Sequence, residues 1–394
     1  METQINKYTL IKEIGRGAYG SVYLAKYSEK PIDEDKESYK DKESYKDEES
    51  NKDEESNKTE KPKYSEIVGK ETIKLKNNTN DVGSSTDTSE LNNTAIVLGK
   101  NKKFAVKKIK NERRFQNASQ REIEYLKKLN NNNFHNAPII KLVDTFIDNR
   151  IQYLVFEHME INMYKYYTKY RLKYEHVIYI FYQLCIGFKY IHSQEIIHGD
   201  LKPENIMLNS KTGQIKIIDF GSSFSVGNQI NNFYMQSRYY RAPELCYRIE
   251  ASTAIDIWSI GCVIYELFFR RPLFPAREAR YELIYLYTTL LGVPINIPKC
   301  QNTYFYSPVF NNQFIWNQET NTYFLRKYYP DDLPIDSQGL SKKLDRKFGE
   351  IYPNVDATEI INVLGNIITY DYTERSNATE ILKSSIFHRY SIEI

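Results

Sequence analysis

The stretch that decides the fold is Ile197–Asn205, with the sequence IHGDLKPEN, followed closely by Asp219–Gly221, with the sequence DFG. It places an acid (Asp200), a lysine (Lys202) and an asparagine (Asn205) on one loop, with a second acid just downstream. A positioned carboxylate can take a proton from a hydroxyl, and amide and carboxylate oxygens are ligands that magnesium accepts. These residues predict a site that moves a proton and holds a phosphate beside a metal ion.

The bulk properties favour an intracellular globular protein. The 394 residues suffice for one large domain or for two lobes with substantial cores. The formal net charge of +3 is close to balance, so direct nucleic-acid binding is not expected. No cysteine pair has Cys-x-x-Cys spacing, which predicts buried thiols in a reducing compartment. The cysteines are Cys185, Cys246, Cys262 and Cys300.

Neither export nor membrane insertion is expected. Met1–Gln4 lacks the basic and apolar regions of a signal peptide. Val177–Ile191 and Ile255–Phe269 are the most apolar stretches, but both contain charged side chains. A membrane span needs about 20 apolar residues, so both stretches predict buried core helices.

Residues 29–98 differ sharply in composition from the rest of the chain. Within them, residues 29–63 carry 14 acidic and 9 basic side chains, a net charge of −5, in near-repeats such as DKESYK. A segment so charged and so poor in aliphatic residues cannot bury enough surface to offset its ordering entropy. We therefore expect a low-complexity, largely disordered insert between two strands, at a turn that accepts long excursions cheaply.

The remaining pattern predicts an α+β protein with two lobes. Strand-like alternation occupies residues 8–27, 103–109, 140–147 and 151–156, with one helix at 117–129 between them. From about residue 160 onward the pattern is mainly helical, with long helices at about 174–193 and 254–269. A small β-rich lobe at about 8–157 should therefore precede a larger α-rich lobe at about 160–389.

Gly15–Val22, with the sequence GRGAYGSV, lies between two strand patterns. Glycines let a backbone approach phosphate oxygens closely, so this loop could cover a nucleotide. A flexible hairpin is an equally good explanation of the motif taken alone. The strand that follows disfavours a dinucleotide-binding fold, which needs a helix at this point.

Lys107 is the candidate cation for phosphate binding. Successive side chains of a strand point to opposite faces, so Lys107 shares a face with Ala105, while Lys108 lies on the other. Glu122, on the following helix, could pair with Lys107 and orient it. Glu124 is the alternative partner, but it lies on a different face of that helix.

Together these motifs resemble the protein kinase superfamily, in the family's order, over about residues 8–389. The resemblance implies the bilobal protein kinase fold, with Mg²⁺ and ATP as cofactors. It implies that Asp200 is the catalytic base, that Lys202 steadies the phosphoryl group and that Lys107, paired with Glu122, orients the α- and β-phosphates. Asn205 and Asp219 would be the magnesium ligands.

The same resemblance implies the remaining parts of the nucleotide site and of its support. Phe156 would be the gatekeeper, with hinge backbone groups at Glu157 and Met159. Asp256 would brace the catalytic loop, and Arg375 would pair with Glu244. The implied nucleotide-binding set is Ile14, Gly15, Gly17, Gly20, Val22, Ala105, Lys107, Phe156, Glu157, Met159 and Met207.

Residues 219–244 resemble the activation segment of the dual-specificity tyrosine-regulated (DYRK) and homeodomain-interacting kinase branches of the CMGC group. Gly199 stands where most kinases carry an arginine that contacts an activation-loop phosphate, and small residues also occur there in these branches. Tyr234 aligns with the tyrosine that these kinases phosphorylate on themselves. Its phosphate would pair with Arg238 and Arg241. Ser237 would bridge the catalytic aspartate and lysine, and residues 280–345 resemble the CMGC insert region.

The resemblance implies a serine/threonine kinase that acts on protein substrates and phosphorylates its own Tyr234. One alternative is a pseudokinase that serves as a scaffold, which the complete catalytic set argues against. Another is a CDC2-like splicing-factor kinase, which would differ in its substrates. We expect a monomer that acts in the cytoplasm, the nucleus or both.

Overall fold

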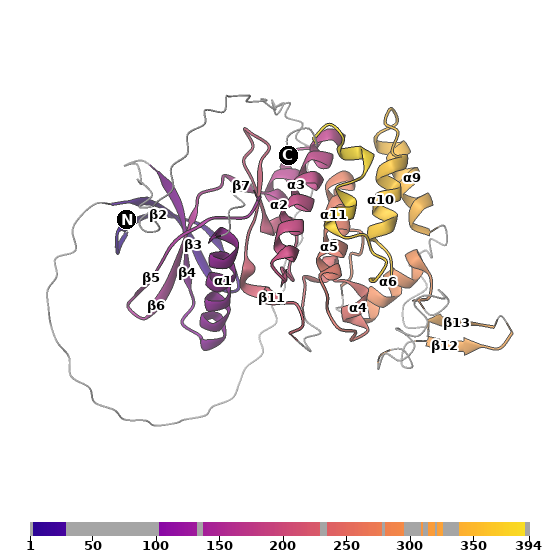
Figure 1. The fold of residues 1–394 in the computed structure, drawn as a ribbon, viewed down its shortest axis with the longest axis horizontal. Helices are drawn as coiled ribbons and strands as arrows, with labels where there is room; N and C mark the ends of the chain where they lie inside the picture. Colours follow the sequence, from indigo (N-terminus) through magenta and orange to yellow (C-terminus); the bar gives the residue numbers. More distant parts are fainter. Residues whose placement is uncertain are drawn as a thin grey trace, which may run out of the picture.

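The computed structural model describes residues 3–28, 102–131, 137–228, 235–277, 280–294, 309, 314–319, 321–325 and 339–390. Within these ranges the chain forms a β-rich lobe followed by a larger helical lobe (Figure 1), which confirms the predicted α+β, bilobal fold. The insert at 29–98, Tyr234, Cys300 and much of 280–345 lie outside the described residues.

The first lobe is built on a six-stranded antiparallel sheet with the strand order β1-β2-β3-β4-β6-β5. Alternation of side chains gives this sheet two different faces. On β4, Phe104 and Val106 are fully buried in a small core with Tyr8, whereas Ala105 and Lys107 lie on the opposite face. The strands are β1 (Thr3–Ile5), β2 (Tyr8–Arg16), β3 (Gly20–Tyr27), β4 (Lys103–Ile109), β5 (Leu142–Asp148) and β6 (Ile151–Glu157).

The helix of this lobe, α1 (Arg113–Asn131), begins four residues before its predicted start at 117. Phe115 is buried, and the backbone N–H groups of Phe115 and Gln116 both donate to the carbonyl of Glu112. These bonds satisfy N–H groups that a helix start otherwise leaves free, so the helix extends over the basic pair Arg113 and Arg114.

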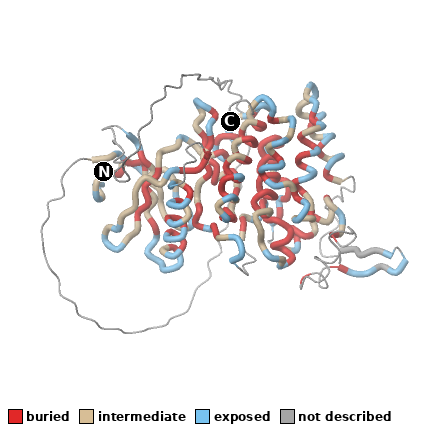
Figure 2. The backbone as a smooth tube through the Cα atoms, in the orientation of Figure 1, coloured by how far each residue is buried: buried red, intermediate tan, exposed pale blue. Residues whose placement is uncertain are grey.

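The second lobe packs its helices around α5 (Figure 2), nearly every residue of which is buried. The stretches predicted to be core helices are confirmed as α3 (Tyr174–Ser193) and α5 (Ala254–Phe269). The other helices are α2 (Met163–Lys169), α4 (Pro243–Cys246), α6 (Tyr281–Leu291), α9 (Gly339–Ile351), α10 (Thr358–Ile367) and α11 (Ala378–Ile381). In the part of the chain that the structure describes, no helix is long and apolar enough to cross a membrane.

Two short sheets lie next to the loops that contain Asp200 and Asp219. One joins β10 (Ile215–Ile217), β9 (Ile206–Leu208) and β7 (Ile161–Asn162) in that order, and the other pairs β11 (Phe224–Ser225) with β8 (Ile196–Ile197). A further hairpin, β12 (Phe314–Asn317) and β13 (Thr322–Leu325), lies within the predicted CMGC insert region.

Arg375 and Glu244 form an ion pair in the interior of the second lobe. The Arg375 guanidinium donates to both carboxylate oxygens of Glu244, at 2.7 and 3.2 Å, and neither side chain is exposed. Because a bidentate pair satisfies both charges, it can be buried without leaving either ion unpaired. It ties the end of the activation segment to the loop before α11, as the resemblance implied. Three of the four cysteines, Cys185, Cys246 and Cys262, are buried free thiols, as predicted.

The strands on either side of the insert are direct neighbours. β3 pairs with β4 along its whole length, and the last pair of the register is Lys26 with Lys103. The ends of these two strands therefore lie where an ordinary hairpin turn would join them. The sheet itself needs only a few residues at this point.

We predict that replacing residues 30–97 by a short Gly/Ser turn leaves the fold intact, because every strand pair between β3 and β4 is kept and a shorter loop closes at lower entropic cost. Far-UV circular dichroism and thermal unfolding of the purified deletion variant measure this. A variant with residues 30–97 in scrambled order is the control for length and composition. Insoluble protein, or loss of cooperative unfolding in the deletion alone, would contradict the prediction.

Candidate active site

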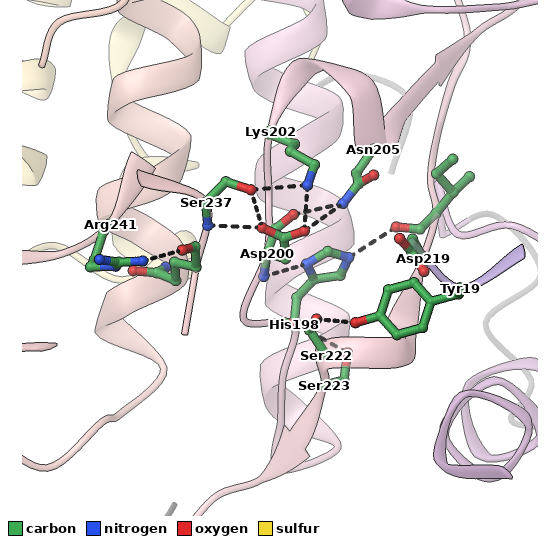
Figure 3. A network of polar contacts seen from close by, with 12 residues as sticks. Tyr19, His198, Asp200, Lys202, Asn205, Asp219, Ser222, Ser223, Ser237 and Arg241 are labelled. Atoms are coloured by element: carbon green, nitrogen blue, oxygen red, sulfur yellow. Dashed lines mark hydrogen bonds and ion pairs between the residues drawn. The ribbon is translucent and has the colours of Figure 1, made fainter. Parts of the chain in front are cut away.

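The loop Ile197–Asn205 and the loop that contains Asp219 come together because β8 pairs with β11 and β9 with β10. The register of the first pair sets Ile197 opposite Phe224, and that of the second sets Ile206 opposite Ile217. Both pairings hold the chain on either side of the two loops. As a result, Asp200 and Asp219 project into the same region (Figure 3).

Asp200 lies at the centre of a closed ring of hydrogen bonds. Its Oδ1 accepts from the backbone N–H of Ser237 at 2.9 Å and from the Ser237 hydroxyl at 2.7 Å. Its Oδ2 accepts from Lys202 Nζ at 2.6 Å, and Lys202 also donates to Ser237 Oγ at 2.9 Å. The Asn205 amide group donates to the Asp200 carbonyl at 2.8 Å. The ring fixes the orientation of the carboxylate from both sides.

The charge of Lys202 depends on this ring. Burial alone would lower the pKa of Lys202, but Asp200, together with Asp219 and Glu204, outweighs burial, so the pKa of Lys202 is raised. Lys202 therefore remains an ammonium at neutral pH. A cation held beside Asp200 is suited to contact a phosphoryl group that approaches the same carboxylate.

The backbone of this loop is anchored to α5 by Asp256, which is completely buried. Asp256 Oδ2 accepts from the backbone N–H of His198 at 2.8 Å, and Oδ1 accepts from that of Gly199 at 2.9 Å. Its Oδ2 also lies 3.0 Å from Nε2 of His192. A buried carboxylate needs such donors, and here they hold the segment that leads into Asp200.

His198 connects the two loops. Its Nδ1 accepts from the backbone N–H of Asp200 at 3.2 Å, and its Nε2 lies 3.0 Å from the carbonyl oxygen of Ile218. These partners assign the neutral tautomer with the proton on Nε2, because a carbonyl can only accept. The imidazole also packs edge-on against Phe220, with 5.0 Å between ring centroids.

The backbone conformation explains the glycine at position 199. Gly199 has a φ of 74°, and a Cβ placed there would lie 3.0 Å from the carbonyl oxygen of Ser222 and 3.2 Å from the ring of Phe224. Any other residue would combine a left-handed backbone with a tight contact. The loop therefore has a local structural reason to lack the arginine that most kinases carry at this position.

Lys107 lies between two carboxylates from different parts of the chain. Its Nζ is 2.8 Å from Glu122 Oε2 on α1 and 3.0 Å from Asp219 Oδ1. Glu124, the alternative partner, is exposed, and one of its oxygens accepts instead from the side-chain amide of Gln120. The ion pair spans the sheet, the helix and the loop after β10.

The electrostatics of this trio follow from burial and mutual charge. Burial opposes the charge on Lys107, but Asp219 and Glu122 outweigh it and raise the pKa of Lys107. Burial would raise the pKa of Asp219, yet Lys107 more than compensates and lowers it. Burial raises the pKa of Glu122, with Asp219 adding to the effect and Lys107 opposing it. Asp219 thus stays ionised at neutral pH.

Asp219 and Asn205 are the described residues best suited to hold a hard cation here. Asp219 has a left-handed backbone, with a φ of 67°. The amide N–H₂ of Asn205 is used by Asp200, which leaves its oxygen as the atom free to ligate. Magnesium needs few protein ligands, because phosphate oxygens and waters complete its coordination. This donor set therefore fits magnesium bound together with a nucleotide.

The glycine-rich loop joins β2 to β3 above Lys107. The backbone N–H of Gly17 donates to the carbonyl of Gly20 at 2.9 Å, which closes the turn. A Cβ at Gly20 would lie 1.9 Å from the carbonyl oxygen of Lys108, so this position requires glycine. Gly15 pairs with Val22 across the hairpin, and Val22 pairs in turn with Lys107.

The predicted adenine-binding residues surround the junction of the two lobes. Ala105 pairs with Phe156, the last buried residue of β6, and Met207 lies half-buried on β9. Glu157 donates its backbone N–H to the carbonyl of Lys141 and accepts from the Lys141 N–H with its carboxylate. This leaves the carbonyl as the hinge group that Glu157 can offer. Ile14 and Met159, the other predicted members of this set, are half-buried.

Sequence reasoning missed Tyr19, which lies inside the glycine-rich loop. Its hydroxyl is 3.2 Å from Ser222 Oγ, and Lys107 Nζ lies 5.4 Å from the centre of its ring. The tyrosine therefore links the glycine-rich loop to the loop after Asp219, and Figure 3 shows its hydroxyl beside Ser222. The only available signal was an aromatic side chain at the variable position of a phosphate-binding loop.

The regulatory residues are placed in part. Arg241 donates to the carbonyls of Met235 and Gln236, at 2.8 and 2.9 Å, and Arg238 donates to the carbonyl of Arg277. Tyr234 lies outside the described residues, so pairing of its phosphate with Arg238 and Arg241 stays a prediction.

The protein kinase domain family model matches residues 89–387 of the chain. The match leaves out β1, β2 and β3, which residues 29–98 separate from β4 in the sequence. In the sheet, however, β3 is the direct neighbour of β4.

Curated relatives point the same way. Extracellular signal-regulated kinase 1 of Candida albicans is 35% identical over 209 residues, covering 51% of this chain and 50% of the relative. Homeodomain-interacting protein kinase 2 of Mesocricetus auratus is 29% identical over 312 residues, covering 72% of this chain and 26% of the relative. Mitogen-activated protein kinase mpk-1 of Caenorhabditis elegans is 29% identical over 296 residues, covering 73% and 60%.

The chain thus spans about half or less of the length of the first two relatives. What it shares with all three is the kinase domain, and these kinases are members of the CMGC group. With the bilobal fold, the ring around Asp200 and the family match all in agreement, the chain belongs to the protein kinase family, and the relatives that it resembles are kinases of the CMGC group.

Proposed function

We propose that this protein transfers the γ-phosphoryl group of Mg·ATP to serine or threonine hydroxyls of protein substrates and phosphorylates its own Tyr234. The observation that carries the proposal is the ring that joins Asp200, Lys202, Ser237 and Asn205. These hydrogen bonds hold a base (Asp200), a cation (Lys202) and a possible metal ligand (the Asn205 oxygen) close together. Phosphoryl transfer requires such an arrangement.

In this proposal Asp200 orients the acceptor hydroxyl and takes its proton as the new O–P bond forms. Ser237 already donates to Oδ1 of Asp200 in the structure, so a second hydroxyl can meet the same carboxylate in a similar geometry. Lys202, held 2.6 Å from Oδ2, faces the oxygens of the phosphoryl group and offsets the charge that develops on them.

Lys107 and Glu122 position the rest of the nucleotide. The Glu122 carboxylate holds the Lys107 ammonium so that it can contact the α- and β-phosphates. Asp219, which is ionised, and Asn205 would hold magnesium. When bound there, magnesium would supply positive charge that offsets part of the negative charge of the phosphates.

A serine/threonine kinase is favoured over a scaffold because every charged group of the set has its partner in place. The relatives named above are kinases of the extracellular signal-regulated, mitogen-activated and homeodomain-interacting types. The expectations of a monomer, of protein rather than nucleic-acid substrates, and of the cytoplasm or nucleus as its location stay predictions.

Asp200→Asn should lower kcat about 10²–10⁴-fold, because the amide cannot accept the hydroxyl proton. Incorporation of phosphate from Mg·ATP into a generic serine/threonine peptide measures this. Asp345→Asn, a change of the same kind at an exposed acid on α9, is the control. Equal activity in the wild type and in Asp200→Asn, with both folded, would favour the scaffold alternative.

Glu122→Gln should lower kcat/KM for ATP about 10–100-fold, the loss expected when a charged hydrogen bond to Lys107 is removed. Glu124→Gln, two positions along the same helix and exposed, should leave kcat/KM unchanged. Steady-state kinetics at varied ATP concentration distinguish the two variants. A larger loss of kcat/KM in Glu124→Gln than in Glu122→Gln would show that Glu124, and not Glu122, is the functional partner of Lys107.

Tyr234 should carry phosphate in protein produced in bacteria, where added tyrosine kinases are absent, because the chain would modify itself. Mass spectrometry of the intact activation segment locates the modified residue. The phosphate should be missing from Asp200→Asn, and Tyr239, an exposed tyrosine nearby, should stay unmodified. Phosphate on Tyr234 in the Asp200→Asn variant would show that another enzyme adds it.

A further inference from the structure

Beyond Glu122, helix α1 has two polar side chains that reach out of the first lobe. The Tyr125 hydroxyl lies 3.3 Å from Ser225 Oγ. Lys128 Nζ donates to the backbone carbonyl of Gln194 at 2.6 Å. Residues three apart lie on neighbouring turns of one helix face, so Glu122, Tyr125 and Lys128 follow one another along the side of α1 that faces the second lobe.

Both contacts end on one small structural unit, which we name the β8–β11 platform and define as residues 194–197 and 224–226. Within it, Ser225 pairs with Ile196, and the backbone N–H of Val226 donates to the carbonyl of Glu195 at 2.9 Å. Tyr125 therefore contacts one edge of the platform, and Lys128 contacts the other.

The platform is where the two catalytic loops begin and end. β8 leads directly into His198 and Asp200, while β11 follows Asp219 and Ser223. The Ser223 hydroxyl donates to the carbonyl of His198 at 3.0 Å, which joins the two loops next to the platform. Docking on this unit therefore fixes the position of α1 relative to both Asp200 and Asp219.

The Lys128 contact has a favourable electrostatic setting. Gln194 caps the C-terminus of α3, where the helix dipole and free carbonyls present negative charge. An ammonium at this position forms a charge-assisted hydrogen bond. Lys127, its neighbour in sequence, is exposed like Lys128 but has no such contact among the described residues.

We propose that Tyr125 and Lys128 are positioning residues that dock α1 on the β8–β11 platform and thereby keep Glu122 in place beside Lys107. Neither residue touches a reacting atom. Their effect on phosphoryl transfer passes through the ion pair, and in this respect the inference rests on the kinase function proposed above.

The kinetic test compares Lys128→Met with Lys127→Met, which removes the same charge from the same helix, and adds Tyr125→Phe and Lys128→Arg. Lys128→Met should lower kcat about tenfold, the value of one charge-assisted hydrogen bond, while KM for the acceptor peptide stays constant. Tyr125→Phe should have a smaller effect in the same direction. Lys128→Arg should restore most of the activity, and Lys127→Met should match the wild type.

A second measurement does not depend on activity. Hydrogen–deuterium exchange of residues 113–131 in nucleotide-free protein should be faster in Lys128→Met and Tyr125→Phe than in Lys127→Met, at equal melting temperature. Equal exchange in Lys128→Met and Lys127→Met would overturn the docking role, whatever the kinetics. If the wild type transfers no phosphate but exchange rises as expected, the kinase function fails and the docking of α1 stands.

Discussion

The interaction on which the site depends is the pair of hydrogen bonds from the backbone N–H groups of His198 and Gly199 to the buried carboxylate of Asp256. A carboxylate without solvent must find donors within the protein. Besides His192, the donors that satisfy it are two consecutive N–H groups of the catalytic loop, which fixes the loop conformation there. Through these bonds α5, which is almost completely buried, holds the backbone of the residue that precedes Asp200.

Starting from Asp256, a hydrogen bond and an ion pair link the catalytic loop to the rest of the site. His198 passes it to the loop before Asp219 by hydrogen bonding to the Ile218 carbonyl. Asp219 passes it to the first lobe through Lys107, whose ammonium is shared by two carboxylates. Two acids against one base leave an excess of negative charge beside Asn205, which suits the binding of a cation.

The parts of this arrangement that could be predicted are those that chain connectivity or strand alternation determines. Asp200, Lys202 and Asn205 lie within one short loop, so their proximity follows from the sequence itself. The face of Lys107 follows from the buried Phe104 and Val106 on the other side of β4. The choice of Glu122 as its partner comes from the resemblance to protein kinases and from the different helix face of Glu124.

The contacts that sequence reasoning did not find join common surface residue types over long separations. Lys128 and Gln194 are 66 residues apart, and Tyr19 and Ser222 are 203 apart. No local pattern marks such pairs, because a lysine or tyrosine on a helix or loop is most often simply solvated. The hydrogen bonds from Arg241 to backbone carbonyls could not be predicted either, because every residue has a carbonyl and none is marked by the sequence.

The conformation of Gly199 has a consequence for how this chain can change over time. Its left-handed backbone and the nearby Ser222 carbonyl mean that any residue with a Cβ introduced at this position would strain the loop. The backbone path that creates this strain is itself held by hydrogen bonds to Asp256 and His198. Substitution of Gly199 is therefore opposed by the geometry of the catalytic loop, whatever the side chain could contact.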